Sequence, residues 1–234
     1  LVDQLELGLD APICLTWELT YACNLSCVHC LSSSGRRDPR ELSTEQCKSI
    51  IDELQKMQVF YVNIGGGEPT IRPDFWHLLQ YAVDHHVGVK FSTNGVRITP
   101  DRARMLASTD YVDVQVSLDG ATSAAHDASR GVPGGWARAV AAIDRLLARD
   151  VPVRIVHVVT PDTEPETEAL IEFAWRLGVA SVQLTPVVPT GAAARGGEWQ
   201  IDAPRLRRIT ERAGDRWPGM PVLMRSGSLT DGMA

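Results

Sequence analysis

The chain has 234 residues, of which 44% are apolar and 22% are charged, and this balance excludes a disordered or fibrous protein. The net charge of −6 and the lack of a basic stripe argue against nucleic-acid binding. No stretch approaches the roughly 18 consecutive apolar residues of a membrane span, and the first residues do not resemble a signal peptide. We therefore expect a cytoplasmic protein without a membrane partner.

Short apolar runs alternate with helical segments along the whole chain. The runs predict six strands, at residues 13–20, 59–65, 87–93, 111–117, 152–160 and 181–188. Regular alternation of strand and helix implies parallel strands with right-handed crossovers. The predicted fold class is α/β, a partial (β/α)6 barrel similar to a TIM barrel, which forms one domain over residues 1–234.

Capping signals mark the starts of three helices: Ser43 with Gln46, Thr99 before Pro100, and Thr163 with Glu166. The first and third pairs predict capping boxes, and the second predicts a helix that begins with proline. Segments 74–86, 136–150 and 202–216 supply the other helices.

Polar residues recur at every second position of the predicted strands, and residues so spaced share one face of a sheet. They are Glu18, Asn63, Lys90, Ser92, Asn94, Gln115, Ser117, Asp119, Gln183 and Thr185. A parallel sheet that is covered on both faces is nearly all apolar, so this pattern predicts a hydrated interior that holds a ligand. The alternative is an ordinary polar core whose groups are hydrogen-bonded to one another.

The unusual motifs fall where predicted strands end. They are YACNLSCVHC, GGGEPT, STNG and SLDG, after the first four strands in order. Ligands of barrels and doubly wound sheets bind at this carboxyl-terminal rim. The accumulation of motifs there predicts an enzyme.

Five cysteines make an odd count, which argues against a fully paired disulfide framework. Three of them form a CxxxCxxC motif: Cys23, Cys27 and Cys30. This spacing indicates a metal or cluster site in a reducing compartment. A zinc site with His29 as fourth ligand is the alternative, and we expect Cys14 and Cys47 to be buried packing residues.

The cysteine motif, together with Gly66-Gly67-Glu68-Pro69 after the next strand, resembles the radical S-adenosylmethionine (SAM) superfamily. Segments 15–42, 59–76 and 85–100 are similar to the mycofactocin-system radical SAM maturases, and the similarity thins after Gly120. The resemblance implies two cofactors, a [4Fe–4S] cluster and SAM. Three thiolates hold three irons of such a cluster, and the fourth iron stays open for SAM.

The resemblance also implies roles for individual residues. Cys23, Cys27 and Cys30 would hold the cluster, and the segment Gly66, Gly67, Glu68 and Pro69 would hold the amino group of SAM. His29 would lie near the adenine. The remaining cofactor contacts would be Thr93, Asn94, Ser117, Asp119 and Thr185, with Ser117 at the ribose and Thr185 at the adenine.

The implied reaction is oxidative decarboxylation and crosslinking of the C-terminal Val-Tyr of a precursor peptide. The implied partners are that peptide, a separate peptide-binding protein and an electron donor. Maturases of this family carry a cysteine-rich SPASM extension, whereas this chain has no cysteine after Cys47, so we expect a piece of a longer protein. Three alternatives stay open: a radical SAM maturase of another peptide or small molecule, a non-catalytic iron–sulfur module, and a zinc-stabilised interaction domain.

Overall fold

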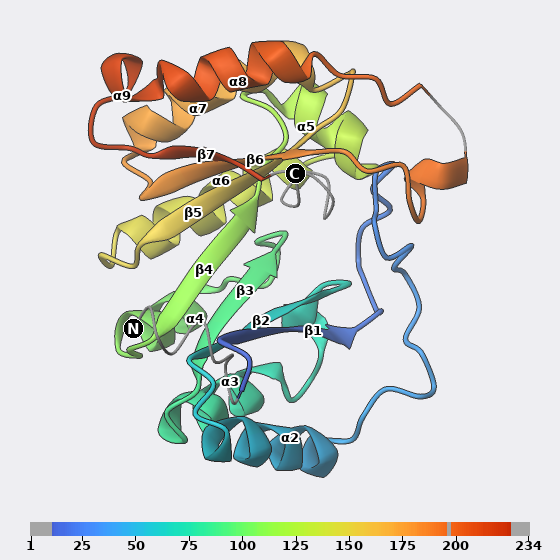
Figure 1. Cartoon of the computed structure of the whole chain (residues 1–234), viewed down its shortest axis with the longest axis vertical. Coiled ribbons are helices and arrows are strands. Elements are labelled where there is room, and N and C mark those ends of the chain that lie inside the picture. The colour runs from blue at the N-terminus through green and yellow to red at the C-terminus, as the bar shows by residue number, and fades with distance from the viewer. Residues whose placement is uncertain (1–10, 196–197, 226–234) are drawn as a thin grey trace.

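The computed structural model describes residues 11–195 and 198–225 (Figure 1). Its centre is one parallel sheet with the strand order β1-β2-β3-β4-β5-β6-β7. The strands are β1 (Cys14–Thr20), β2 (Tyr61–Gly66), β3 (Gly88–Thr93), β4 (Val112–Ser117), β5 (Val153–Val159), β6 (Ser181–Pro186) and β7 (Val222–Met224). In the described part of the chain β1 and β7 form the two edges and do not pair, so the barrel stays open.

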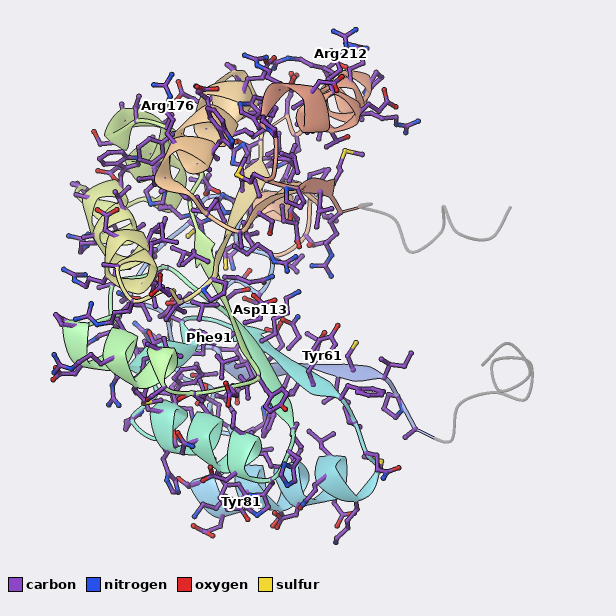
Figure 2. All side chains as sticks on the ribbon, turned by 90° about the vertical axis from the view of Figure 1, so that its left-hand side faces the viewer. Tyr61, Tyr81, Phe91, Asp113, Arg176 and Arg212 are labelled. Carbon is purple, nitrogen blue, oxygen red and sulfur yellow. The ribbon has the colours of Figure 1, made fainter. Side chains whose placement is uncertain are left out.

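Helices follow the strands in turn and lie mainly on one side of the curved sheet (Figures 1 and 2). They are α2 (Thr44–Lys56), α3 (Phe75–Asp84), α4 (Pro100–Ala107), α5 (Ser123–Arg130), α6 (Gly135–Leu147), α7 (Thr167–Leu177), α8 (Ala203–Glu211) and α9 (Ala213–Arg216). Short 3₁₀ turns cover Pro69–Ile71, Glu164–Glu166 and Ala193–Arg195. Among the described residues, none of these helices combines the length and apolar character that crossing a membrane requires.

The predicted α/β architecture is confirmed, with three differences. The short strand β7 was not predicted, because three residues carry too little of a repeating pattern to be recognised. The helix α5 was missed as well, and the helix predicted over 202–216 is divided between α8 and α9.

The predicted helix starts at Ser43 and Thr99 are confirmed. Ser43 accepts a hydrogen bond from the backbone N–H of Gln46, whose side chain accepts one from the N–H of Ser43 in return. The capping box predicted at Thr163 is wrong. The Thr163 hydroxyl donates to the carbonyl of Val158 and faces Thr160, and α7 begins only at Thr167.

The apolar core lies between the sheet and its helices. Phe91 of β3 is fully buried and makes edge-to-face contacts with Phe75 and Trp76 of α3, at ring-centroid distances of 5.2 and 6.2 Å. Cys47 is buried in this core, as predicted. Cys14 is exposed at the start of β1, so the prediction that it is a buried packing residue is wrong.

We expect Phe91→Ala to lower the free energy of unfolding by about 3–5 kcal/mol, because it leaves a cavity inside an aromatic cluster. Phe60→Ala is the matched control, since Phe60 is 74% exposed, and it should change stability by less than about 0.5 kcal/mol. Urea denaturation followed by circular dichroism measures both. Equal effects of the two substitutions would contradict this account of the core.

Candidate cofactor site

A cavity of about 740 Å³ opens at the carboxyl-terminal ends of the strands. Of the predicted site residues, it is lined by Cys23, Cys27, Cys30, His29, Gly66, Gly67, Glu68, Thr93, Asn94, Ser117 and Thr185. The sheet thus brings together motifs from segments that are more than a hundred residues apart in sequence. Two predicted cofactor residues, Pro69 and Asp119, do not line it.

The three motif cysteines lie on the long loop between β1 and α2, which runs along the right-hand side of Figure 1. Backbone hydrogen bonds close this loop on itself, from Cys23 N–H to Gly35 O at 3.1 Å and from Gly35 N–H to Tyr21 O at 2.8 Å. The closure holds the thiols on one side of the cavity.

Each of the three sulfur atoms has a nitrogen donor nearby. Cys23 Sγ accepts from the backbone N–H of Leu25 at 3.4 Å, and Cys30 Sγ accepts from that of Ser34 at 3.3 Å. Cys27 Sγ accepts from the Arg130 guanidinium at 3.8 Å. Donors of this kind stabilise the negative charge of thiolates that bind metal.

The charge state of these thiols depends on what binds them. Burial raises the pKa of Cys23 and of Cys27 above the ordinary value of a thiol. Both groups are therefore neutral at pH 7 without a cation, and binding of iron displaces their protons. Three thiols with a donor at each sulfur fit a [4Fe–4S] cluster.

The zinc alternative required His29 to join the three thiols. His29 instead directs Nδ1 toward the Ser129 hydroxyl at 3.2 Å and Nε2 toward an Asp119 oxygen at 3.6 Å. Within the described ranges, no group of three or more His, Cys, Asp and Glu side chains is arranged to hold a single metal ion. Both ring nitrogens of His29 are thus directed to partners other than the three thiols.

Gly67 allows the end of β2 to lie directly against the cysteine loop. A Cβ atom there would lie 2.0 Å from the carbonyl oxygen of Ala22, so any side chain would push the two segments apart. The contact is held by hydrogen bonds from Gly67 N–H to Thr20 O at 2.6 Å and from Glu68 N–H to Ala22 O at 2.8 Å.

The carboxylate of Glu68 is buried and accepts four hydrogen bonds. The donors are Thr70 N–H at 3.1 Å, Thr70 Oγ1 at 2.5 Å, Thr93 Oγ1 at 2.7 Å and Asn94 N–H at 2.6 Å. Burial raises the pKa of Glu68, although these donors oppose the shift. The side chain therefore ties β2 to β3, and the backbone of this segment faces the cavity. Pro69 begins the buried 3₁₀ turn that follows.

The two predicted rim residues after β3 also connect neighbouring segments. Thr93 donates to Glu68, and Asn94 Nδ2 donates to Asn24 Oδ1 of the cysteine loop at 2.8 Å. Ser117 and Thr185 line the cavity from β4 and β6, and the Thr185 hydroxyl accepts from Gln183 at 3.3 Å.

Asp119 has no exposed surface and anchors a network of polar groups beside the cavity. Its carboxylate lies 2.6 Å from Arg130 Nε, accepts from Ser129 Oγ at 3.1 Å, and accepts from the N–H of Val158 at 2.9 Å. Burial alone would raise the pKa of Asp119, but the Arg130 charge, together with His157 and His29, outweighs it and holds the pKa well below its ordinary value. The ring of His157, on β5, lies 3.7 Å from the same carboxylate.

Arg130 is the main site residue that was missing from the sequence-based prediction. It is 7% exposed, it lines the cavity, and its Nη2 has no hydrogen-bond partner among the described residues. A buried guanidinium with an unused donor suits an anionic group of a ligand. In the sequence Arg130 is visible only as part of the pair Arg130-Gly131 after the fourth strand. Its contact with Cys27 is revealed by the folded chain alone.

Comparison with known proteins agrees with this geometry. Residues 17–174 match the Radical SAM superfamily, and the chain belongs to it. The cofactors of this superfamily are SAM and a [4Fe–4S] cluster, as the resemblance implied.

Two relatives illustrate the similarity in sequence. The chain is 62% identical over 192 residues to mycofactocin maturase MftC of Mycobacterium tuberculosis, a match that covers 82% of this chain and 49% of that protein. It is 36% identical over 190 residues to an AdoMet-dependent heme synthase of Methanosarcina barkeri, covering 81% of this chain and 54% of that protein. The chain thus spans about half the length of these relatives.

The fold resembles that of SuiB from Streptococcus suis in complex with S-adenosylmethionine. The TM-score is 0.82 at 20% identity, over 92% of this chain and 51% of that one. At this low identity the likeness concerns the fold alone, and it agrees with the predicted partial barrel.

The histidine next to the Asp119 network predicts a pH dependence of stability. The ring of His126 accepts the N–H of Asp119 at 3.1 Å, and burial lowers its pKa from 6.5 to about 4. Between these two pH values the unfolded chain binds a proton that the folded chain does not. The contribution of His126 to the free energy of unfolding should therefore fall as pH decreases from 6.5 to about 4, by about 1.4 kcal/mol per pH unit.

Urea denaturation at pH 7, 6 and 5 measures this slope. His126→Gln should be less stable at pH 7 but should lose less stability on acidification than the wild-type protein. Equal losses in the two proteins would show that His126 is not the group responsible.

Proposed function

We propose that the chain is the SAM-cleaving part of a radical SAM peptide maturase of the mycofactocin type. One observation carries the proposal: a single cavity is lined by three thiols that each accept a hydrogen bond, by the glycines after β2 and by the buried guanidinium of Arg130. The 62% identity to mycofactocin maturases supports the type.

In this proposal Cys23, Cys27 and Cys30 hold the [4Fe–4S] cluster. When bound, the cluster supplies the electron that cleaves the sulfonium of SAM and yields a 5′-deoxyadenosyl radical. The protein binds and orients the cofactor and keeps competing reactions out. The cysteine loop stays in position because backbone hydrogen bonds fix it at Gly35, Gly67 and Glu68.

The residues around the cavity have distinct proposed roles toward SAM. The backbone at Gly66 and Gly67 takes the amino group, and Arg130 takes the carboxylate with the donor that it does not use within the protein. Ser117 contacts the ribose, and Thr185 contacts the adenine. Thr93, Asn94, Glu68, Pro69 and Asp119 act by holding these groups in place, and His29 supports the loop through Ser129.

The proposed substrate is a precursor peptide that ends in Val-Tyr, and the reaction is its oxidative decarboxylation and crosslinking. A separate peptide-binding protein delivers the peptide, and an external donor supplies electrons. The proposal also includes a cytoplasmic location. It rests on the similarity to mycofactocin maturases, of which this chain spans about half.

The reaction is tested with the anaerobically reconstituted chain, SAM, dithionite and a synthetic peptide that ends in Val-Tyr. We expect 5′-deoxyadenosine, measured by chromatography, and a change in the electron paramagnetic resonance signal when SAM is added. A cluster that ignores SAM would instead indicate an electron carrier. Mass spectrometry of the peptide, with and without the peptide-binding protein, tests the proposed substrate.

The first variant test concerns the cluster ligands. Cys27→Ala should lose most of the iron and sulfide found after anaerobic reconstitution, because the remaining two thiolates hold a cluster poorly. Cys14→Ala is the matched control and should keep the wild-type content, since Cys14 is exposed at the other end of β1. Full iron content in Cys27→Ala would overturn the assignment.

The second variant test concerns the SAM cavity and uses Gly65. Gly65 lines the cavity, and no atom lies within 4 Å of its Cβ position, so Gly65→Val projects into the ligand space without disturbing the protein. SAM affinity should fall about tenfold or more at unchanged iron content. Gly67 is unsuitable, because a side chain there would strike Ala22.

Gly214 of α9 also has open space at its Cβ position, which makes Gly214→Val the control for a glycine replacement as such. Equilibrium dialysis with labelled SAM measures affinity in all three proteins. Unchanged affinity in Gly65→Val would mean that SAM does not occupy this part of the cavity.

A further inference from the structure

The concave face of the sheet carries polar side chains below the cofactor cavity in two neighbouring rows. By strand register, one row contains Thr16, Asn63, Lys90 and Asp113, and the next contains Ser92, Gln115 and Arg154. Thr16, Asn63 and Ser92 line the cavity, and register partners project from the same face of a sheet. Lys90, Asp113, Gln115 and Arg154 therefore continue its floor toward the other end of the barrel (Figure 2 labels Asp113).

The charges in these rows do not balance. Lys90 Nζ lies 3.9 Å and Arg154 Nη2 lies 3.4 Å from the same oxygen of Asp113, so two cations share one carboxylate at long distances. Their side chains are 24% and 26% exposed, which leaves them within reach of a ligand. Glu18 is a second carboxylate that lines the cavity. It lies on β1, however, and β2 separates it from β3, which carries Lys90.

Three buried polar atoms of the same rows have no hydrogen-bond partner among the described residues. They are Gln115 Nε2, Arg154 Nε and Asn63 Oδ1. Gln115 is only 5% exposed, and its other amide atom accepts from Ser92 Oγ at 2.9 Å. Native proteins rarely leave such groups unsatisfied, so their presence beside a cavity points to a ligand that completes them.

The chemistry of these atoms defines the ligand. Gln115 Nε2, Arg154 Nε and the Lys90 ammonium are all donors, and two of them carry positive charge, so they suit an acceptor-only anion. Asn63 Oδ1 is an acceptor and suits an N–H group. The C-terminal residue of a peptide offers both, because its carboxylate and its backbone N–H are attached to the same carbon.

We propose that Lys90, Arg154 and Gln115 bind the C-terminal carboxylate of the peptide substrate, and that Asn63 accepts the N–H of its last residue. The inference rests on the proposed function, because it assumes that a peptide enters the barrel. Asp113 keeps the two cations oriented before the peptide arrives.

The position of the site relates the bound terminus to the cofactor. Gln115 lies two residues before Ser117, which lines the cofactor cavity, and this separation along a strand is about 7 Å. Gln115 also accepts a hydrogen bond from Ser92, another residue that lines the cavity. A carboxylate held at Gln115 therefore leaves the last residue of the peptide beside the SAM end of the cavity, where the proposed decarboxylation takes place.

The test measures binding of labelled synthetic peptides to the reconstituted chain with SAM bound, by fluorescence anisotropy. The first peptide ends in Val-Tyr with a free carboxylate and has no acidic side chain, and the second is its C-terminal amide. The third is the same amide with an aspartate before the valine, which supplies a carboxylate from a side chain. We expect the free acid to bind about tenfold more tightly than either amide.

The variants connect this preference with the named residues. Lys90→Gln and Arg154→Gln should each reduce the preference for the acid to about threefold or less. Asp113→Asn removes the competing carboxylate and should keep or increase the preference, which tests the site even if Arg154→Gln folds poorly. Lys56→Gln is the control, because Lys56 lies exposed on α2, and it should behave as wild type.

The proposal is overturned if the wild-type chain does not distinguish acid from amide, if it does not bind the acid, or if both charge variants keep the full preference. Tight binding of the aspartate peptide alone would reassign the site to an acidic side chain and overturn the terminal assignment. Formation of 5′-deoxyadenosine by the same preparation is measured in parallel. Intact formation beside a failed preference would reject this site while leaving the proposed function in place.

Discussion

The arrangement of the cofactor site depends on the buried ion pair between Asp119 and Arg130. Both side chains are almost fully removed from solvent, and a buried charge that loses its partner destabilises a protein by about 3–5 kcal/mol. Because Asp119 follows β4 and Arg130 ends α5, the pair holds α5 over the end of the sheet. The same end of α5 meets the cysteine loop through the hydrogen bond from Val28 N–H to Ser129 O at 3.2 Å. One electrostatic contact thus joins the sheet, the helix and the loop that carries the thiols.

The cysteine loop has a second anchor on its other side, where close backbone approach replaces charge. Gly67 meets Ala22 at a distance that no side chain allows. Of the four hydrogen bonds that Glu68 accepts, those from Thr93 and Asn94 bind the ends of β2 and β3 together. A loop without regular structure can therefore hold three thiols in place, because both of its flanks are fixed to rigid elements.

The two faces of the sheet have different roles: one packs the apolar core, and the other carries the polar residues of the candidate site. On the helix side, Phe91 and its aromatic neighbours fill the core, whereas the concave side carries polar residues from the rim down to Lys90 and Asp113. The apolar face and the polar face both follow from the alternation of side chains along each strand. A closed barrel would fill this interior with packed side chains, and the open edge between β1 and β7 leaves it available to ligands. Several of the polar residues at alternate positions line the cavity, among them Asn63, Ser92 and Ser117.

Local patterns in the sequence determined much of this protein. Six strands, the helix starts at Ser43 and Thr99, the three cysteines and the glycine rim after β2 were all predictable, because each depends on neighbouring residues or on a short, specific spacing. Only the tertiary structure decided which rim residues face the cavity. Asp119 has the spacing of a cofactor contact yet turns toward Arg130, and Thr163 has the spacing of a cap yet bonds back to β5. In both cases a contact that forms only in the folded chain competes with the local pattern and determines where the side chain points.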